Sequence, residues 1–177
     1  MRIVGGSLRG RVLSDFKGED IRPTADKVRE SFFNILQFKI AGKSFLDLFC
    51  GTGAVGIESY SRGAAAVTFN DLSKKSLEVL NKNLTALKIK DQVTVNMGDG
   101  IAFLDHTTKK FDIIFIDPPY KSGLGELAVA KSLNALTGDG VVILEDEKEF
   151  VGDVCGLVVS DKRKYGRVHL TFFVKEK

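Results

Sequence analysis

The chain has 177 residues, a hydrophobic content of 44% and a formal net charge of +3, which suit one domain with a sizeable core rather than two or more substantial domains. No apolar run approaches the roughly 18 residues that a membrane-spanning helix needs, so a membrane protein is excluded. The N-terminus has no continuous apolar stretch of the secretory kind, and the only cysteines are Cys50 and Cys155. We therefore expect a reduced, cytoplasmic protein.

The two ends of the chain differ in charge from its middle. Residues 1–43 and residues 161–177 each carry a net charge of +4, whereas residues 44–160 carry −5. An asymmetry of this kind indicates a polyanion-binding surface attached to an acidic body. Two short basic segments are also common as plain solvated surface, and the charge pattern alone leaves both interpretations open.

The first 43 residues predict a small extension and a helix. Two short runs, Arg2–Val4 and Arg11–Leu13, flank a centre that contains Gly and Ser, so residues 1–22 are predicted to form a basic hairpin extension. Residues 24–38 have apolar residues at helical spacing, with Thr24 as a plausible N-cap.

From residue 44 onward, short apolar runs alternate with stretches of helical spacing. This pattern is typical of a parallel sheet with crossover helices, and we expect residues 44–177 to form the α/β core. Ser73–Leu87 is predicted to be a helix capped by Ser73, and a second leucine pattern after Leu124 predicts a helix that ends near Gly138 and Gly140. The predicted strands are Phe45–Phe49, Ala66–Asn70, Val93–Met97, Phe111–Ile116 and Val141–Leu144, followed by an antiparallel hairpin of Leu157–Lys164 and Val168–Val174.

A glycine-rich turn follows the first predicted strand of this core, and a helix opens directly after it. Gly51 and Gly53 lack the Cβ atoms that would keep a ligand from the backbone, and the helix offers unpaired N–H groups. Gly51-x-Gly53-x-x-Gly56, with Asp71 at the end of the second strand, matches the dinucleotide fingerprint, so an NAD(P)-dependent oxidoreductase is one hypothesis. However, Asp47 precedes the turn, where its carboxylate would repel a pyrophosphate and would favour a cationic ligand such as S-adenosylmethionine.

Two acidic residues follow successive predicted strands. Asp71 ends the second strand, and Asp99 follows the third. Each one singly is most often a turn residue or a helix cap. Together, at the carboxyl edge of a parallel sheet beside a glycine turn, they favour a bound adenosine, with one acid on the ribose hydroxyls and the other on the adenine amino group.

The fourth strand of the core runs into Asp117-Pro118-Pro119-Tyr120. Two consecutive prolines make this turn rigid and remove two backbone donors. The Asp117 carboxylate and the Pro118 carbonyl can accept the two hydrogens of an exocyclic amine, while Tyr120 offers a face on which a base can stack. This arrangement favours direct attack of the amine on a methyl sulfonium, and the target base must be unpaired or flipped out of a duplex.

These motifs resemble a known family. Asp47-Leu48-Phe49-Cys50-Gly51-Thr52-Gly53 together with Asp117-Pro118-Pro119-Tyr120 is similar to class I S-adenosylmethionine-dependent amino-methyltransferases, and the N-terminal third resembles the RsmD family, which methylates N2 of one guanine in 16S ribosomal RNA. The resemblance implies a Rossmann-like, mostly parallel class I methyltransferase sheet with an antiparallel C-terminal hairpin. The segments that carry the N-terminal resemblance are Arg2–Arg11, Arg22–Glu30 and Phe33–Leu36.

The resemblance also implies site residues. Asp47, Gly51 and Gly53 would hold the methionine part of S-adenosyl-L-methionine, Asp71 its ribose and Asp99 its adenine edge. Gly100 and Thr24 are further expected cofactor contacts. Asp71 stands where the family often has Glu, and Cys50 stands where Ala is common.

The implied partner is ribosomal RNA within an assembling small ribosomal subunit. Phosphate contacts are expected from arginines in the basic N-terminal region, with a solvated surface as the alternative. His106 and His169 lack metal-ligand spacing, so no metal is expected. Two further hypotheses stay open, an amino-methyltransferase that acts on DNA adenine or a protein amide, and a non-catalytic RNA-binding assembly factor. The expected phosphate contacts are Arg2, Arg9, Arg11, Arg22 and Arg29.

Overall fold

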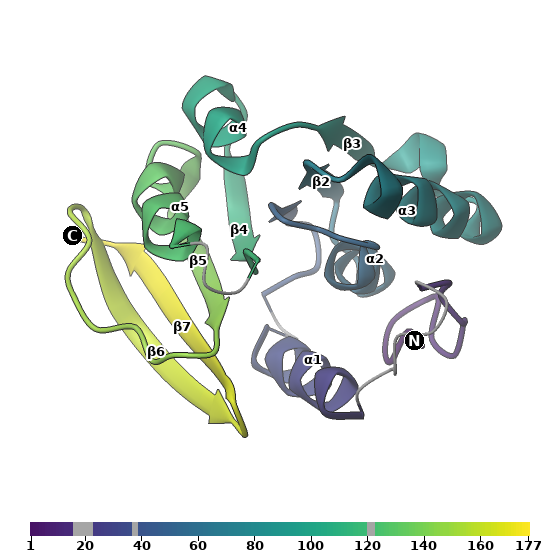
Figure 1. The fold of residues 1–177 in the computed structure, drawn as a ribbon, viewed down its shortest axis with the longest axis horizontal. Coiled ribbons are helices and arrows are strands. Elements are labelled where there is room, and N and C mark those ends of the chain that lie inside the picture. The colour runs from purple at the N-terminus through teal and green to yellow at the C-terminus, as the bar shows by residue number, and fades with distance from the viewer. Residues whose placement is uncertain (16–22, 37–38, 120–122) are drawn as a thin grey trace.

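The computed structural model describes residues 1–15, 23–36, 39–119 and 123–177, without the side chains of residues 23–27. Within these ranges the chain forms a seven-stranded sheet of order β3-β2-β1-β4-β5-β7-β6 (Figure 1). Neighbouring strands from β3 to β5 run parallel, and β7 is antiparallel to both β5 and β6. The predicted α/β fold with an antiparallel C-terminal hairpin is therefore confirmed. The strands are β1 (Ser44–Asp47), β2 (Ala66–Asp71), β3 (Thr94–Met97), β4 (Phe111–Ile116), β5 (Leu136–Asp146), β6 (Leu157–Tyr165) and β7 (Val168–Lys175).

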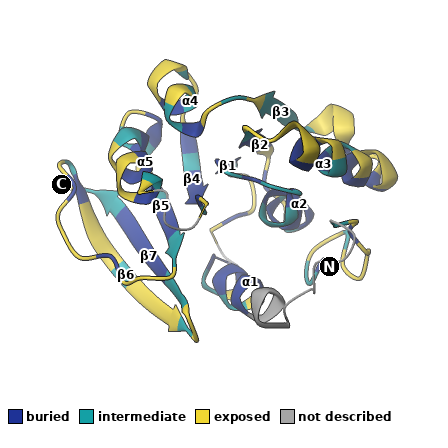
Figure 2. Ribbon diagram, viewed as in Figure 1, coloured by how far each residue is buried: buried dark blue, intermediate teal, exposed yellow. Residues whose placement is uncertain are grey.

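Helices cover both faces of the sheet. On one face, side chains of α1, α2 and α3 share a hydrophobic cluster with the sheet, and on the other face α4 and α5 contribute to a second cluster. The central strands β1, β2 and β4 are largely buried, whereas the edge strand β6 is mostly exposed, as are the outer faces of the helices (Figure 2). None of the helices in the described ranges is both long and apolar enough to cross a membrane. The helices are α1 (Pro23–Leu36), α2 (Ala54–Ser61), α3 (Lys74–Leu87), α4 (Gly100–His106) and α5 (Leu124–Ser132), with a short 3-10 turn at Lys90–Gln92.

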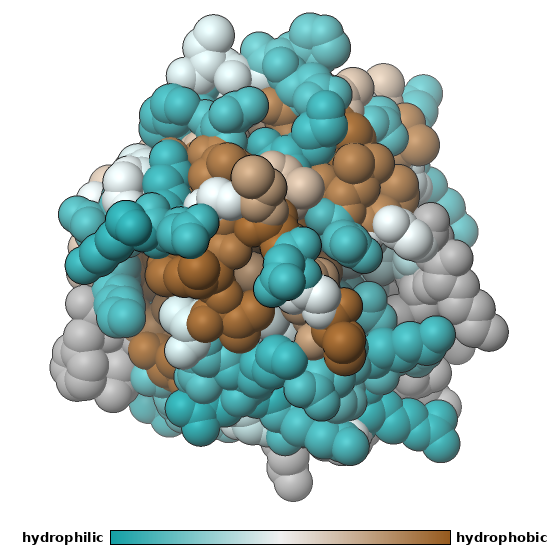
Figure 3. Space-filling model, turned by 90° about the vertical axis from the view of Figure 1, so that its left-hand side faces the viewer, coloured by the Kyte–Doolittle hydropathy of each residue, from teal (hydrophilic) through white to brown (hydrophobic). Residues whose placement is uncertain are grey.

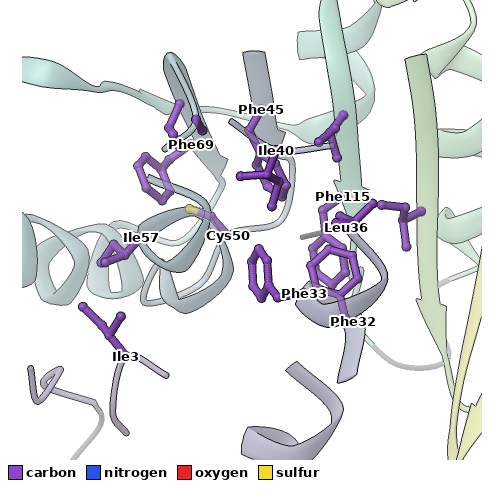
Figure 4. Packing of buried hydrophobic residues seen from close by; sticks show 14 of the residues in the cluster. Ile3, Phe32, Phe33, Leu36, Ile40, Phe45, Cys50, Ile57, Phe69 and Phe115 are labelled. Atoms are coloured by element: carbon purple, nitrogen blue, oxygen red, sulfur yellow. The ribbon is translucent and has the colours of Figure 1, made fainter. Parts of the chain in front are cut away.

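The first cluster is built largely from aromatic rings. Phe32 of α1 lies 5.1 Å from Phe115 of β4 and 4.6 Å from Phe33, measured between ring centroids. Figure 4 shows these rings beside Phe45, while Ile3 of the N-terminal segment approaches Ile57 of α2. The cluster thus joins residues that lie far apart in the sequence and holds α1 against β4.

The N-terminal segment folds back on itself and docks on α2. Arg2 and Val12 form an antiparallel bridge, so the two runs predicted to pair do pair, although over too short a length to count as strands. The buried Glu58 carboxylate accepts hydrogen bonds from the backbone N–H groups of Val4 and Gly5, both at 2.8 Å, and also pairs with Arg62 at 2.9 Å. This carboxylate therefore anchors the extension to the core.

Two helix boundaries differ from the sequence predictions. α1 begins at Pro23, a residue suited to the first helical position, so Thr24 lies inside the helix and is not its N-cap. α5 ends at Ser132, whereas the leucine spacing predicts a helix that continues to about Gly138. Leu136 instead begins β5 opposite Phe111, and a register shift follows in this strand pair. Burial of Leu136 against β4 therefore decides its conformation, because a strand can bury an isolated leucine as well as a helix can.

Exposed apolar side chains gather on the side formed by the C-terminal hairpin and α5. Figure 3, which faces that side of the molecule, shows a brown apolar area surrounded by hydrophilic residues. In these elements and the loop that joins β5 to β6, four large hydrophobic residues are exposed. They are Leu127, Val151, Val158 and Val159.

The turn before α2 yields a stability prediction. Gly53 and Gly10 both have φ = +85°, but a Cβ at Gly53 would lie 2.2 Å from Cδ1 of the buried Leu80, whereas a Cβ at Gly10 would meet nothing within 4 Å. We expect Gly53→Ala to lower the free energy of unfolding by about 1–3 kcal/mol more than Gly10→Ala does, because only the former overpacks the core. Urea unfolding of both variants measures the difference, and equal losses would contradict the packing account.

Candidate active site

Five carboxylates gather where the parallel strands end. Asp47 closes β1, Asp71 closes β2, Asp99 follows β3, Asp117 follows β4 and Glu145 lies near the end of β5. The carboxyl ends of parallel strands meet at one edge of a sheet, which is where ligands bind in folds of this type. The acidic middle of the sequence thus supplies one cluster of carboxyl groups at this edge.

Asp47 is the most deeply buried of these acids, with 2% of its surface exposed. Its Oδ2 accepts a hydrogen bond of 2.8 Å from the backbone N–H of Gly56 in the first turn of α2. The pKa of Asp47 is raised to about 7, chiefly because burial disfavours its charged form; the Gly56 hydrogen bond opposes the shift, and the charges of Asp117 and Asp71 contribute to it. A cation bound nearby would stabilise the ionised form of this group.

Asp71 and Asp99 hold local backbone and also face a cavity. Asp71 accepts hydrogen bonds from the N–H groups of Gly51, at 2.8 Å, and Ser73, at 2.7 Å. Asp99 is the N-cap of α4 and accepts from the N–H of Ala102 at 2.8 Å. Both residues line a cavity of roughly 290 Å³. A carboxylate has about four acceptor positions, so both can cap their turns and still receive hydrogen bonds from a ligand. The other lining residues are Phe49, Leu72, Gly100, Asp117, Pro118, Pro119 and Leu124.

The glycines of the loop serve different purposes. A Cβ at Gly51 would meet nothing within 4 Å, so this position leaves open space in front of the backbone. A Cβ at Gly53 would instead overlap Leu80, and one at Gly100 would come within 2.7 Å of the Phe49 ring. Core packing therefore requires a glycine at position 53 but not at position 51. That both glycines make room for a ligand stays a prediction.

Asp117 stands between two cavities. It lines the 290 Å³ cavity described above and also a second cavity of roughly 460 Å³. Burial raises its pKa well above the usual range, and the charges of Glu145 and Asp146 add to the shift. Pro118 is buried and Pro119 exposed, while the fourth residue of the motif, Tyr120, lies outside the described residues.

The second cavity is formed by segments from both ends of the chain. α1 contributes one wall, β4 and β5 contribute the floor beside Asp117, and the turn between β6 and β7 contributes the opposite wall. Its apolar residues offer a flat ring a place to pack. The lining residues are Met1, Val28, Arg29, Phe32, Ala54, Val55, Phe115, Asp117, Glu145, Glu147, Gly166, Arg167 and Val168.

The predicted phosphate contacts do not share one environment. Arg2, Arg9 and Arg11 are exposed on the N-terminal segment. Arg29 is only 6% exposed, donates a 2.6 Å hydrogen bond to the backbone oxygen of Arg2 and lies 3.9 Å from the Glu58 carboxylate. Arg29 thus lines the second cavity and is not part of a solvated helix face, which was the alternative to a phosphate contact. Arg22 lies outside the described residues, and the Thr24 side chain is not described.

Sequence reasoning missed two residues of the second cavity. Glu145 follows the predicted strand Val141–Leu144 directly, so the same rule that selected Asp71 and Asp99 would have selected it. Arg167 belongs to the predicted hairpin turn, and only the folded arrangement brings this turn beside Asp117. Cys50 is buried, and desolvation is the chief cause of its raised thiol pKa, which disfavours the thiolate that a nucleophile needs. Among the described residues, no three His, Cys, Asp or Glu side chains are placed so that together they could hold a metal ion.

A mostly parallel sheet of this order, with a glycine turn after β1 and an Asp-Pro-Pro motif after β4, defines a Rossmann-like class I methyltransferase. The family model described as conserved hypothetical protein 95 matches residues 1–174. Ribosomal RNA small subunit methyltransferase D of Haemophilus influenzae is 37% identical over 154 residues, covering 84% of this chain and 80% of that protein. Its namesake in Escherichia coli is 36% identical over 151 residues, covering 84% of this chain and 76% of that protein. The chain therefore belongs to this methyltransferase family, and the predicted RsmD resemblance is confirmed.

Solved structures agree with this assignment. The structure of yhhF from Escherichia coli covers 99% of this chain with 98% of its own length, at 32% identity and a TM-score of 0.89. The correspondence includes both basic ends of the chain as well as the central sheet, because almost the full length of each protein is matched.

Proposed function

We propose that this protein transfers a methyl group from S-adenosylmethionine to the exocyclic N2 amine of a guanine in small-subunit ribosomal RNA. The observation that carries the proposal is the position of Asp117, which borders two cavities at once. One cavity has the acids suited to an adenosine, and the other has the apolar and basic lining suited to a nucleotide. A group at their junction can touch a reactive amine next to a methyl donor.

The residues of the first cavity and those of the glycine turn fit this cofactor. The positive charges of S-adenosylmethionine suit the buried Asp47, because a cation nearby stabilises the carboxylate and lowers its raised pKa. Asp71 and Asp99 would hold the ribose hydroxyls and the adenine edge, and the open space in front of Gly51 admits the ligand to the backbone. When bound, the cofactor supplies an electrophilic methyl group on a sulfonium. A dinucleotide fits less well, because the Gly56 N–H that would meet a phosphate already binds the Asp47 carboxylate.

Asp117 and the backbone carbonyl of Pro118 would act on the amine. Each accepts one of its two hydrogens, which draws the nitrogen towards a pyramidal geometry and directs its lone pair at the methyl group. The amine loses one proton in the reaction. Because burial and neighbouring charges raise the pKa of Asp117, its carboxylate is a suitable acceptor for that proton.

The cofactor proposal predicts a pH dependence that belongs to Asp47. Its pKa is about 7 without a ligand, so the group is largely neutral at pH 6 and largely ionised at pH 8. A cationic ligand prefers the ionised form, so affinity should rise with pH across this window, by about fivefold if binding lowers the pKa by about one unit. Titration calorimetry with S-adenosylmethionine at both pH values measures the change. Asp47→Asn should bind more weakly and with a smaller pH dependence, and an unchanged pH dependence in this variant would contradict the assignment.

The exposed arginines of the N-terminal segment would contact RNA phosphates. We expect the double variant Arg9→Ala/Arg11→Ala to bind 16S RNA more weakly and to reduce the slope of log affinity against log salt concentration by about 2. Cofactor affinity should stay unchanged, because both side chains are exposed and neither lines the cofactor cavity. Filter binding over a salt series tests this. An unaltered slope would show that these arginines are merely solvated.

We also propose that the natural substrate is an assembling small subunit, because the basic contacts come from short segments of one chain and the RNA fold must supply the remaining selectivity. The test is transfer of tritium from labelled S-adenosylmethionine to free 16S RNA, partly assembled particles and complete subunits, all taken from cells that lack the enzyme. We expect label in guanosine as N2-methylguanosine, with the highest rate on the partly assembled particles. Label in adenosine, in DNA or in protein, or no label at all, would refute the proposed reaction.

A further inference from the structure

We propose that the Glu145 carboxylate selects guanine by accepting a hydrogen bond from N1–H of the target base, beside Asp117 at the N2 amine. This inference rests on the proposed function and deepens it, because it names the residue that distinguishes guanine from adenine in the second cavity.

The strand register places the two carboxylates next to each other. Ile116 of β4 pairs with Leu144 of β5, so Asp117 and Glu145 follow at equivalent positions. The backbones of neighbouring strands in a sheet lie about 4.8 Å apart. Ile116 and Leu144 both pack into the cluster on the side of α4 and α5. Because successive side chains alternate between the faces of a sheet, the next residues turn towards the side of α1, and both line the cavity that contains Phe32.

The Glu145 side chain lines this cavity, and none of the described residues donates a hydrogen bond to its carboxylate. Among the described residues, no hydrogen bond or ion pair is formed by its oxygens. The side chain is partly buried, and desolvation raises its pKa to about 7. A partly buried carboxylate without a donor has lost part of its hydration and gained no hydrogen bond in return, and a ligand that brings an N–H group into the cavity supplies one.

The hydrogen-bonding edges of the bases then decide which base fits. Guanine presents N1–H and the N2 amine side by side, so two adjacent acceptors match two adjacent donors. Adenine presents an amine next to N1, which is an acceptor and would face the carboxylate of Glu145 with a lone pair. A site built from buried acceptors rejects an analogue that lacks the matching donor far more strongly than an apolar pocket would.

The experiment replaces the target guanine with 2-aminopurine, which keeps the N2 amine but has an unprotonated N1. Small-subunit particles are rebuilt on 16S RNA with either base at the mapped position, and kcat/KM for methyl transfer is measured on both. We expect the wild-type enzyme to prefer guanine by at least about 100-fold. In Glu145→Gln the preference should fall below about tenfold, because an amide can donate to N1 as readily as it accepts from N1–H.

Glu126→Gln is the matched control, since Glu126 is exposed on α5 and lines neither of the two cavities. Its guanine preference should equal that of the wild-type enzyme. Calorimetric binding of S-adenosylhomocysteine by Glu145→Gln shows that the variant is folded. A guanine preference that stays near 100-fold in Glu145→Gln would overturn the inference, as would a wild-type enzyme that methylates both bases equally. A wild-type enzyme that leaves the guanine particles unmethylated would refute the proposed function itself.

Discussion

Replacement of Asp117 by alanine should lower the rate of methyl transfer by about 10²–10⁴-fold and leave the affinity for S-adenosylhomocysteine within about threefold. The variant loses both the hydrogen-bond acceptor for the amine and the acceptor for its departing proton, two contributions that act on the reacting group. The cofactor cavity keeps Asp71 and Asp99, and Asp47 remains beneath the glycine turn. Single-turnover transfer of labelled methyl groups and calorimetry measure the two quantities separately.

Asp117→Asn separates the two contributions. The amide oxygen still accepts a hydrogen from the amine, but the amide cannot take up the proton. We expect this variant to keep substantially more activity than Asp117→Ala, and to lose the part of the pH dependence of kcat that belongs to Asp117. If Asp117→Ala were as active as the wild-type enzyme, Asp117 would have no place in the reaction.

Replacement of Glu58 by alanine should cost about 3–5 kcal/mol of unfolding free energy, the loss expected when one partner of a buried ion pair is removed. Its carboxylate is 1% exposed, receives the N–H groups of Val4 and Gly5 and pairs with Arg62. Without it, two backbone donors and a guanidinium lose their acceptor at the junction between the N-terminal segment and α2. Denaturant unfolding measures the loss.

Glu78→Ala serves as the control for Glu58, because Glu78 is an exposed acid on α3. It should change the free energy of unfolding by no more than about 0.5 kcal/mol. A loss below about 1 kcal/mol in Glu58→Ala would mean that the N-terminal segment does not depend on this carboxylate. Because Met1 and Arg29 line the second cavity, Glu58→Ala should also weaken RNA binding.

Local sequence signals predicted the elements that local physics determines. Ser73 caps α3 by accepting from the N–H of Ser76, as the position of a serine before a helical leucine pattern indicates. Short apolar runs between polar turns predict the strands of the core. Because parallel strands have their carboxyl ends at one edge of the sheet, the acids that follow them, Asp71, Asp99 and Asp117, are also predicted to lie at that edge.

The remaining features depend on contacts between distant residues. The sequence predicts Arg29 as an exposed phosphate contact, but the side chain is buried, donates a hydrogen bond to the Arg2 backbone oxygen and lies 3.9 Å from Glu58. Leu136 continues a helical spacing, yet its pairing with Phe111 makes it a strand residue. The second cavity combines α1 with the β6–β7 turn, and no pattern along the sequence relates these two segments. Such features arise from tertiary packing, which a single sequence records only indirectly.

The most direct test of the account is mass spectrometry of the nucleosides of 16S ribosomal RNA from cells with and without the gene for this protein. The account predicts that N2-methylguanosine disappears from one position in the deletion strain, returns with the wild-type gene, and stays absent with Asp117→Ala. If the 16S RNA of the deletion strain carries the same methylated guanosines as the wild-type RNA, the proposed function is wrong.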